Sequence, residues 1–168
     1  MMETERILLR PFRDSDEEIL FDFINDPEVA YNTGWSLCIG REDSRSFLLE
    51  SFNNDHTWVI ELKGTGDTIG CIHHDEVRIP IQYMHDKNQR EVGVWIGRPY
   101  WNHGFCTEAL RLLVDHCFNK IGVTALWGGC YIENQASARV MEKCGFIDEM
   151  EGQGPNGRPA RIMKLEKR

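Results

Sequence analysis

Apolar positions along the chain follow two spacings, one typical of strands and one typical of helices. Alternating or short continuous apolar runs predict strands over residues 5–12, 56–63, 68–77, 90–97, 124–132, 146–151 and 160–166. Apolar residues three and four positions apart predict helices over residues 16–25, 41–53, 104–120 and 134–143. Strands and helices alternate in a mixed order, so the pattern predicts an α/β protein with a mixed sheet.

Cap and breaker residues mark where several of these helices begin and end. Asp14 and Ser15 precede the first helix as candidate caps, and Pro27 closes it as a breaker. Gly122 is placed to end the third helix, because glycine readily adopts the left-handed conformation found at many helix C-termini. Asn134 is a suitable N-cap for the last helix.

Length and composition are those of an ordinary globular domain. The chain has 168 residues, 41% hydrophobic and 27% charged, so we expect one domain over residues 1–168. No apolar run approaches the ~18–20 residues that cross a bilayer, and the opening MMETERILLRPF is charged rather than signal-like. We therefore expect a cytoplasmic protein without membrane contact. Its six cysteines form no CxxC pair and are expected to be reduced.

Charge and motif content argue against several classes of function. The net charge of −8 argues against nucleic acid as a partner, because phosphate contacts need a basic surface. The P-loop pattern GxxxxGK[ST] and the dinucleotide pattern GxGxxG are both absent. The run His73-His74-Asp75-Glu76 contains metal-binding residue types, but consecutive strand residues point to opposite faces of a sheet. We therefore expect no metal site.

The segment RPYWNHGFCTEAL, residues 98–110, joins a predicted strand to a predicted helix. The first N–H groups of a helix have no intrahelical partners and attract anions. Gly104 lacks the Cβ that would keep a pyrophosphate away from this backbone, and Thr107 offers a hydroxyl near the same donors. A purely structural role for Gly104 and the aromatic residues beside it explains the segment equally well.

Two longer runs decide between these interpretations. The run from Glu91 to Ala109, EVGVWIGRPYWNHGFCTEA, and the run from Asn134 to Phe146, NQASARVMEKCGF, resemble the GNAT superfamily of acetyl-CoA-dependent N-acetyltransferases. The resemblance is closest to its RimJ/RimL-like, ribosomal-protein-type branch, and it covers nearly the whole chain apart from an insertion around residues 78–89. It implies a single-domain GNAT-like fold, with a mostly antiparallel sheet of about seven strands and about four flanking helices.

The resemblance also implies an acetyl-CoA site and a set of residue roles. The backbone of Val94, Trp95 and Ile96 is expected to run alongside the pantetheine arm. The loop expected to bind the cofactor consists of Trp101, Asn102, His103, Gly104, Phe105, Cys106 and Thr107, and its amides from Asn102 to Thr107 are expected to hold the pyrophosphate. Asn134 is expected both to cap its helix and to hydrogen-bond the cofactor arm. Glu91 is the expected general base, and Ser137 is the expected substitute for the superfamily's general acid.

Several positions depart from the superfamily pattern. Trp101 and Cys106 occupy the first and last positions of its loop pattern, Arg/Gln-x-x-Gly-x-Gly/Ala, and Asn102 stands where this branch usually has Gly. Met141 occupies the place where many members keep a tyrosine as general acid, so that role cannot be carried over. These departures bear on the approach to phosphate and on how the leaving thiol is protonated.

The chemistry favours direct attack of a neutral amine on the thioester. A lysine amine has a pKa of ~10.4 and an α-amine one of ~7.7–8.0. A protein N-terminus is therefore deprotonated more easily by a catalytic base near neutral pH. Transfer through a covalent acyl-Cys106 is the alternative route, with His103 three residues away in the turn.

The leading hypothesis is acetylation of the N-terminal α-amine of a protein or peptide. The alternatives are acetylation of a small amine, such as an antibiotic or metabolite, and a non-catalytic acyl-CoA-binding module. The acceptor is expected between the first two helices, the loop over residues 31–41 and the terminal hairpin. We expect the protein to be a monomer or a homodimer.

Overall fold

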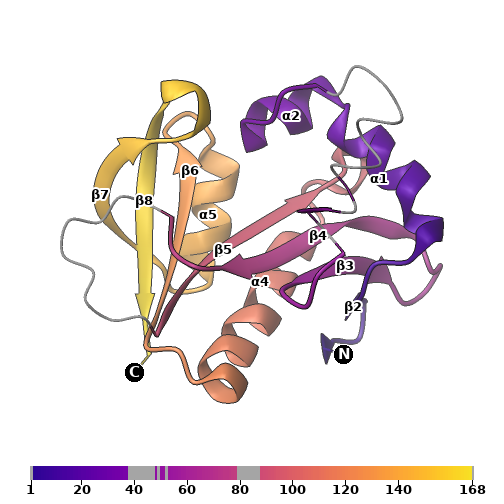
Figure 1. Cartoon of the computed structure of the whole chain (residues 1–168), viewed down its shortest axis with the longest axis horizontal. Helices are drawn as coiled ribbons and strands as arrows, with labels where there is room; N and C mark the ends of the chain where they lie inside the picture. The colour runs from indigo at the N-terminus through magenta and orange to yellow at the C-terminus, as the bar shows by residue number, and fades with distance from the viewer. Residues whose placement is uncertain (1, 38–47, 49, 52, 79–87, 168) are drawn as a thin grey trace.

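The fold is built on one sheet, whose labelled strands spread across Figure 1. The computed structural model describes residues 2–37, 48, 50–51, 53–78 and 88–167. Within them, eight strands pair in the order β1-β2-β3-β4-β5-β6-β8-β7. These are β1 (Met2–Glu3), β2 (Ile7–Arg10), β3 (Thr57–Leu62), β4 (Thr68–Asp75), β5 (Gln89–Ile96), β6 (Ala125–Tyr131), β7 (Ile147–Gln153) and β8 (Pro159–Glu166).

The predicted α/β class and the mixed, mostly antiparallel sheet are confirmed. Every neighbouring pair of strands is antiparallel except β5 and β6, which are parallel. The strand that the sequence did not predict is β1, which pairs with β2 through Met2 and Glu3. Two residues are too short for any alternation of apolar and polar positions, so no pattern could predict it.

Helices cover both faces of the sheet. On one face, α4 (Phe105–His116) and α5 (Gln135–Lys143) pack in an apolar cluster that includes Ile72, Val92 and Ile96 of β4 and β5. On the other, α1 (Glu17–Ile24) and α2 (Pro27–Thr33) pack with Cys71 and Trp95 of the same two strands. Successive residues of β4 and β5 therefore face opposite helix layers, as strand geometry requires.

The first helix ends before Pro27 as predicted, but Pro27 also begins a second helix that the sequence did not predict. It is the first residue of α2, and Asp26 caps that helix by accepting the Glu28 N–H at 2.9 Å. Proline is tolerated at this position because its missing N–H has no intrahelical acceptor there anyway. The chain therefore ends α1 at Ile24 and starts a second, seven-residue helix almost at once.

The predicted N-terminal caps of the first helix are wrong. Neither Asp14 nor Ser15 caps it; both lie in a short 3-10 turn before α1, where the Asp16 carboxylate accepts the Arg13 N–H at 2.7 Å. Asp16 is buried and accepts two further hydrogen bonds of 2.7 Å from the Arg10 guanidinium of β2. This buried ion pair fixes the start of α1 against the sheet.

The remaining helix predictions have mixed outcomes. The helix predicted over residues 41–53 lies largely outside the described residues, although Leu48, Glu50 and Ser51 are helical. The long helix predicted over residues 104–120 is α4 followed by a π-helical turn, Cys117–Ile121, and Gly122 ends it in a left-handed conformation as predicted. Among the described residues, none of the helices is long and apolar enough to span a membrane.

Candidate active site

The sheet opens between its two parallel strands. The pairing of β5 with β6 consists of Gln89 with Ala125, Arg90 with Leu126 and Glu91 with Trp127. Beyond Glu91, β5 continues beside β4 as far as Ile96, while β6 continues beside β8. Within the described residues, the facing edges of β5 and β6 are therefore unpaired past this point, and Figure 1 shows the two strands diverging.

The exposed edge of β5 presents backbone hydrogen-bonding groups to this opening. The Gly97 N–H donates to the Ile69 carbonyl of β4 at 2.8 Å. Backbone groups alternate sides along a strand, so those of Trp95 also point to β4, whereas those of Val94 and Ile96 point into the opening. The Ile96 carbonyl already accepts a hydrogen bond from the Trp101 indole N–H at 2.7 Å. The N–H and C=O of Val94 and the N–H of Ile96 therefore remain along this edge.

The loop after β5 leads to the N-terminus of α4, which has no side-chain cap. Asn102 and Gly104 both adopt positive φ angles, 64° and 85°, which turn the chain into the helix. Gly104 is the N-cap, and no side chain caps α4. The first-turn N–H groups are thus directed outward without a side-chain acceptor, as an anion site requires. The Trp101–Ile96 hydrogen bond anchors this loop to the end of β5.

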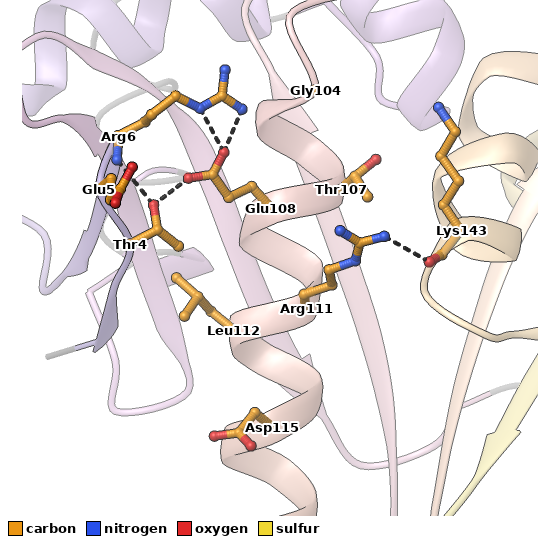
Figure 2. Close-up of a pocket in the computed structure, with 10 residues that line it drawn as sticks. All are labelled: Thr4, Glu5, Arg6, Gly104, Thr107, Glu108, Arg111, Leu112, Asp115 and Lys143. Carbon is orange, nitrogen blue, oxygen red and sulfur yellow. Dashed lines mark hydrogen bonds and ion pairs between the residues drawn. The ribbon is translucent and has the colours of Figure 1, made fainter.

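An open groove of about 750 Å³ runs from this N-terminus along α4. Figure 2 shows Arg6 and Glu108 paired on one side of the helix, with Arg111 reaching toward Lys143 on the other. The Arg6 Nε donates to Glu108 at 2.8 Å, and Arg111 donates to the Lys143 carbonyl at 3.2 Å. Three cationic side chains therefore line this groove, and one of them, Arg6, is paired with Glu108.

Cys106 is poorly suited to covalent transfer. Burial, with a smaller effect of Cys144, raises the pKa of its thiol to about 12, so it is protonated at neutral pH. The nucleophile in such chemistry is the thiolate. The ring of His103 is engaged elsewhere: its Nδ1 lies 2.7 Å from the Trp101 carbonyl and it stacks on Phe105. These contacts argue against a covalent acyl-Cys106 route.

Asn134 caps α5 as predicted. Its Oδ1 accepts the Ser137 N–H at 3.1 Å, which leaves the Nδ2 amide group as a donor at the mouth of the opening. Met141, two turns into the helix, is buried, and its methyl group fills the space above Gly128 of β6. Met141 therefore has a packing role at the place where a tyrosine acid would stand.

Glu91 lies where the opening begins. One of its carboxylate oxygens accepts the Arg78 N–H at 3.0 Å. The two arginines nearest to Glu91 in this part of the sequence bind other groups: Arg98 binds Asp26 at 2.8 Å, and the Arg90 guanidinium donates to the Gln89 carbonyl at 2.8 Å. By strand alternation the Glu91 side chain is on the same face as Trp95, the face covered by α1 and α2.

The wide end of the opening is bridged by a contact that the sequence did not predict. Arg158, before β8, stacks between the rings of Tyr31 and Tyr131, at 3.8 and 3.6 Å from their centroids. It also donates to Glu133 and to the Tyr31 carbonyl, both at 2.6 Å. Tyr31 belongs to α2, so this contact ties the first half of the chain to the terminal hairpin. No local pattern signals it, because Tyr31 and Arg158 are over 100 residues apart.

Part of the predicted acceptor region is outside the described residues. The described residues leave out residues 38–41 of the predicted acceptor loop. They also leave out residues 79–87 of the insertion. The described end of the loop places Trp35 edge-on against Trp95, with ring centroids 5.3 Å apart. Trp35 thus lines the face of β5 on which Glu91 also lies.

Comparison with known proteins gives the family. A family model described as the acetyltransferase (GNAT) domain matches residues 6–147. The chain belongs to this family. YoaA of Bacillus subtilis, described as an uncharacterized N-acetyltransferase, is 27% identical to this GNAT protein over 155 residues, covering 89% of this chain and 84% of its own.

Solved structures show the same fold. A GNAT-family acetyltransferase from Bacillus anthracis superposes with a TM-score of 0.84 at 22% identity, covering 98% of this chain and 97% of its own. The spermidine N-acetyltransferase of Vibrio cholerae, solved with CoA and spermine, gives a TM-score of 0.79 at 15% identity, covering 97% and 96%. The expected class, an acetyl-CoA-dependent N-acetyltransferase, is confirmed by the family model and the curated relative.

Proposed function

We propose that this GNAT enzyme transfers the acetyl group of acetyl-CoA to the N-terminal α-amine of a protein or peptide, as members of the RimJ/RimL-like branch do. The observation that carries the proposal is the position of two sets of free backbone donors in one opening. The edge of β5 at Val94 and Ile96 offers one set, and the uncapped start of α4 offers the other. An extended pantetheine arm would pair with the first and its pyrophosphate with the second.

The proposed residue roles rest on this placement. The backbone of Val94 and Ile96 would hold the pantetheine arm, with Trp95 between them and Asn134 donating from the other side of the opening. The N–H groups from Asn102 to Thr107 would bind the pyrophosphate, and Trp101 would hold this loop against the end of β5 through its indole N–H. A free β5 N–H would also stabilise the oxyanion that forms on the thioester carbonyl.

Proton transfer would complete the reaction. Glu91 is the proposed general base, acting through an intermediate group or water, because the nucleophilic amine must be neutral and must lose a proton after attack. Ser137, at the first turn of α5, is the proposed donor to the departing thiol, which has a pKa of ~8.5 and needs little help to leave. Holding amine and thioester in line would supply the larger share of the acceleration.

A small amine is the second candidate acceptor. The solved structure of the spermidine N-acetyltransferase of Vibrio cholerae, which shares this fold, contains CoA and spermine. The α-amine is preferred here for two reasons: the resemblance of the chain to the RimJ/RimL-like branch, and the lower pKa of an α-amine, ~7.7–8.0 against ~10.4 for an alkyl amine such as that of lysine.

The acceptor is tested with matched peptides. One peptide carries a free N-terminus and an internal lysine, and a second has the same sequence with its N-terminus blocked; spermidine is the third acceptor. We expect acetylation of the free peptide at its α-amine, located by fragment mass spectrometry, and no transfer to the blocked one. Glu91→Gln should slow this transfer by about 10²-fold or more. Transfer to spermidine alone would replace the proposed acceptor with a small amine.

A further inference from the structure

His73 lies on β4 beside the strand that is proposed to hold the thioester. It is directly opposite Gly93 in the pairing of β4 with β5. A Cβ on Gly93 would lie 2.4 Å from Cε1 and 2.8 Å from Nε2 of the His73 ring. The imidazole therefore occupies the space that a side chain of residue 93 would fill, and it covers the backbone of β5 itself.

This part of β5 is the part that faces the opening. Gly93 lies between Val92 and Val94, whose backbone groups point away from β4. The Val92 carbonyl is directed toward Gly128 of β6, where the two strands begin to separate. The imidazole is thus one residue away from the edge proposed to hold the thioester.

The face of the sheet is also the right one. Strand alternation places His73 with Cys71, on the side covered by α1 and α2, where Trp35 of the predicted acceptor loop also packs. The side chain is neither fully buried nor fully exposed. Within the described part of the chain, neither ring nitrogen of His73 has a hydrogen-bond partner, so one is available to a bound amine.

Glu91 is less directly placed. It is diagonal to His73 across the strand pair, a position with Cβ atoms roughly 7 Å apart. Its flanking backbone is still paired on both sides, with Asp75 and with Trp127, and its carboxylate binds the Arg78 N–H. A proton leaving the amine would therefore meet His73 before it reaches Glu91, with one water bridging the last step.

We propose that His73 is the catalytic base that contacts the acceptor amine and takes its proton, with Glu91 receiving that proton in turn. The inference rests on the proposed amine acetylation. The amine nitrogen attacks the thioester carbonyl, the new C–N bond forms, and the nitrogen loses its proton to the imidazole. The C–S bond then breaks, and the CoA thiolate leaves with a proton from Ser137, which solvent restores as Glu91 releases the other.

The protonation state of His73 suits this role. Burial lowers the pKa of His73 below 6.5, with Asp75 opposing and Arg78 adding to the effect. Among the described residues, strand geometry also places the charged Glu91 of β5 near the ring. The imidazole is therefore neutral at neutral pH and can accept a proton. Activity should fall as the pH drops through this lowered pKa, because the protonated ring is no longer a base.

The test compares His73→Gln with wild type and with His56→Gln, a matched change at an exposed histidine outside the opening. On an acceptor that the wild type acetylates, we expect His73→Gln to lower kcat by about 10²-fold or more and to lose the acidic limb of the pH profile. The KM for acetyl-CoA should stay within about twofold, which shows that the variant is folded and binds its cofactor. His56→Gln should behave as wild type.

Chemical rescue separates catalysis from structure. Added imidazole should restore part of the activity of His73→Ala and should not affect His56→Gln. The proposal is overturned if His73→Gln keeps the wild-type kcat and pH profile, or if kcat falls but imidazole restores nothing and the acidic limb persists. Either result leaves the proposed function intact, because the wild type still acetylates its amine. A wild type that acetylates no amine would overturn both.

Discussion

Two adjacent histidines of β4 show how completely the two faces of the sheet differ. His73 lies over Gly93 on the face of α1 and α2, whereas His74 points to the face of α4 and packs beside Trp58, with ring centroids 5.6 Å apart. His74 is buried, and its Nδ1 has no hydrogen-bond partner among the described residues. One histidine is available to a substrate, and the other is a neutral group enclosed in the core.

The stability of the fold in mild acid should depend on His74. Burial, followed by the nearby His56, Arg90 and His116, lowers the pKa of His74 from 6.5 to about 4. Between these pH values the unfolded chain binds a proton that the folded protein does not. Stability is therefore fully retained above pH 6.5 and falls by up to about 3 kcal/mol as the pH approaches 4.

Urea unfolding at a series of pH values measures this loss. His74→Phe keeps an aromatic ring beside Trp58 but cannot titrate, so its free energy of unfolding should depend less on pH over the same range. Part of the slope should remain, because burial also lowers the pKa values of His73 and His116. Identical slopes for the wild type and His74→Phe would show that His74 does not resist protonation in the folded state.

At the scale of elements, the start and the end of the α4 segment are both formed by glycines with positive φ. Gly104 precedes α4 with φ 85°, and Gly122 ends the π-helical turn with φ 81°. Among the described residues, a Cβ on Gly122 would meet nothing within 4 Å, and one on Gly104 would meet only Arg6, at 3.6 Å. The two positions thus impose the same conformational demand, but only Gly104 adjoins the proposed phosphate site.

Alanine at these two positions should separate strain from cofactor binding. Gly104→Ala and Gly122→Ala should each lower the free energy of unfolding by about 1 kcal/mol, because a Cβ disfavours the left-handed conformation. Only Gly104→Ala should weaken acetyl-CoA binding, by about tenfold or more in Kd, because its methyl group stands in the path of the phosphate. Calorimetric titration measures this, and equal Kd values for the two variants would contradict the phosphate-loop assignment.

At the scale of the whole molecule, the site is an opening between two halves of one sheet. The halves are joined through three register pairs of β5 with β6 and through the packing of α4 against α5. Arg158, stacked between Tyr31 and Tyr131, joins them again at the wide end. The opening is therefore bounded at both ends, which fixes the distance between the edge of β5 and the start of α5.

The sequence predicts those parts of this arrangement that depend on local chemistry. The alternation of β5, the glycine before α4 and the Asn134 cap are each encoded within a few residues, and all were predicted. The second helix at Pro27 was missed because the missing N–H of proline both ends a preceding helix and is tolerated at the first position of a new one. The place of His73 over Gly93 depends on strand register, and the Arg158 contact on residues over 100 positions apart, so neither has a local signal.

The central claim is that a thioester held in this opening is attacked by an amine. The most direct test is the release of free CoA thiol from acetyl-CoA by the wild-type protein, with and without a peptide that has a free N-terminus. The account predicts thiol release that depends on the peptide and matches the acetylated peptide formed mole for mole. Release at the same rate without any amine, or tight acetyl-CoA binding with no release on any amine, would contradict it.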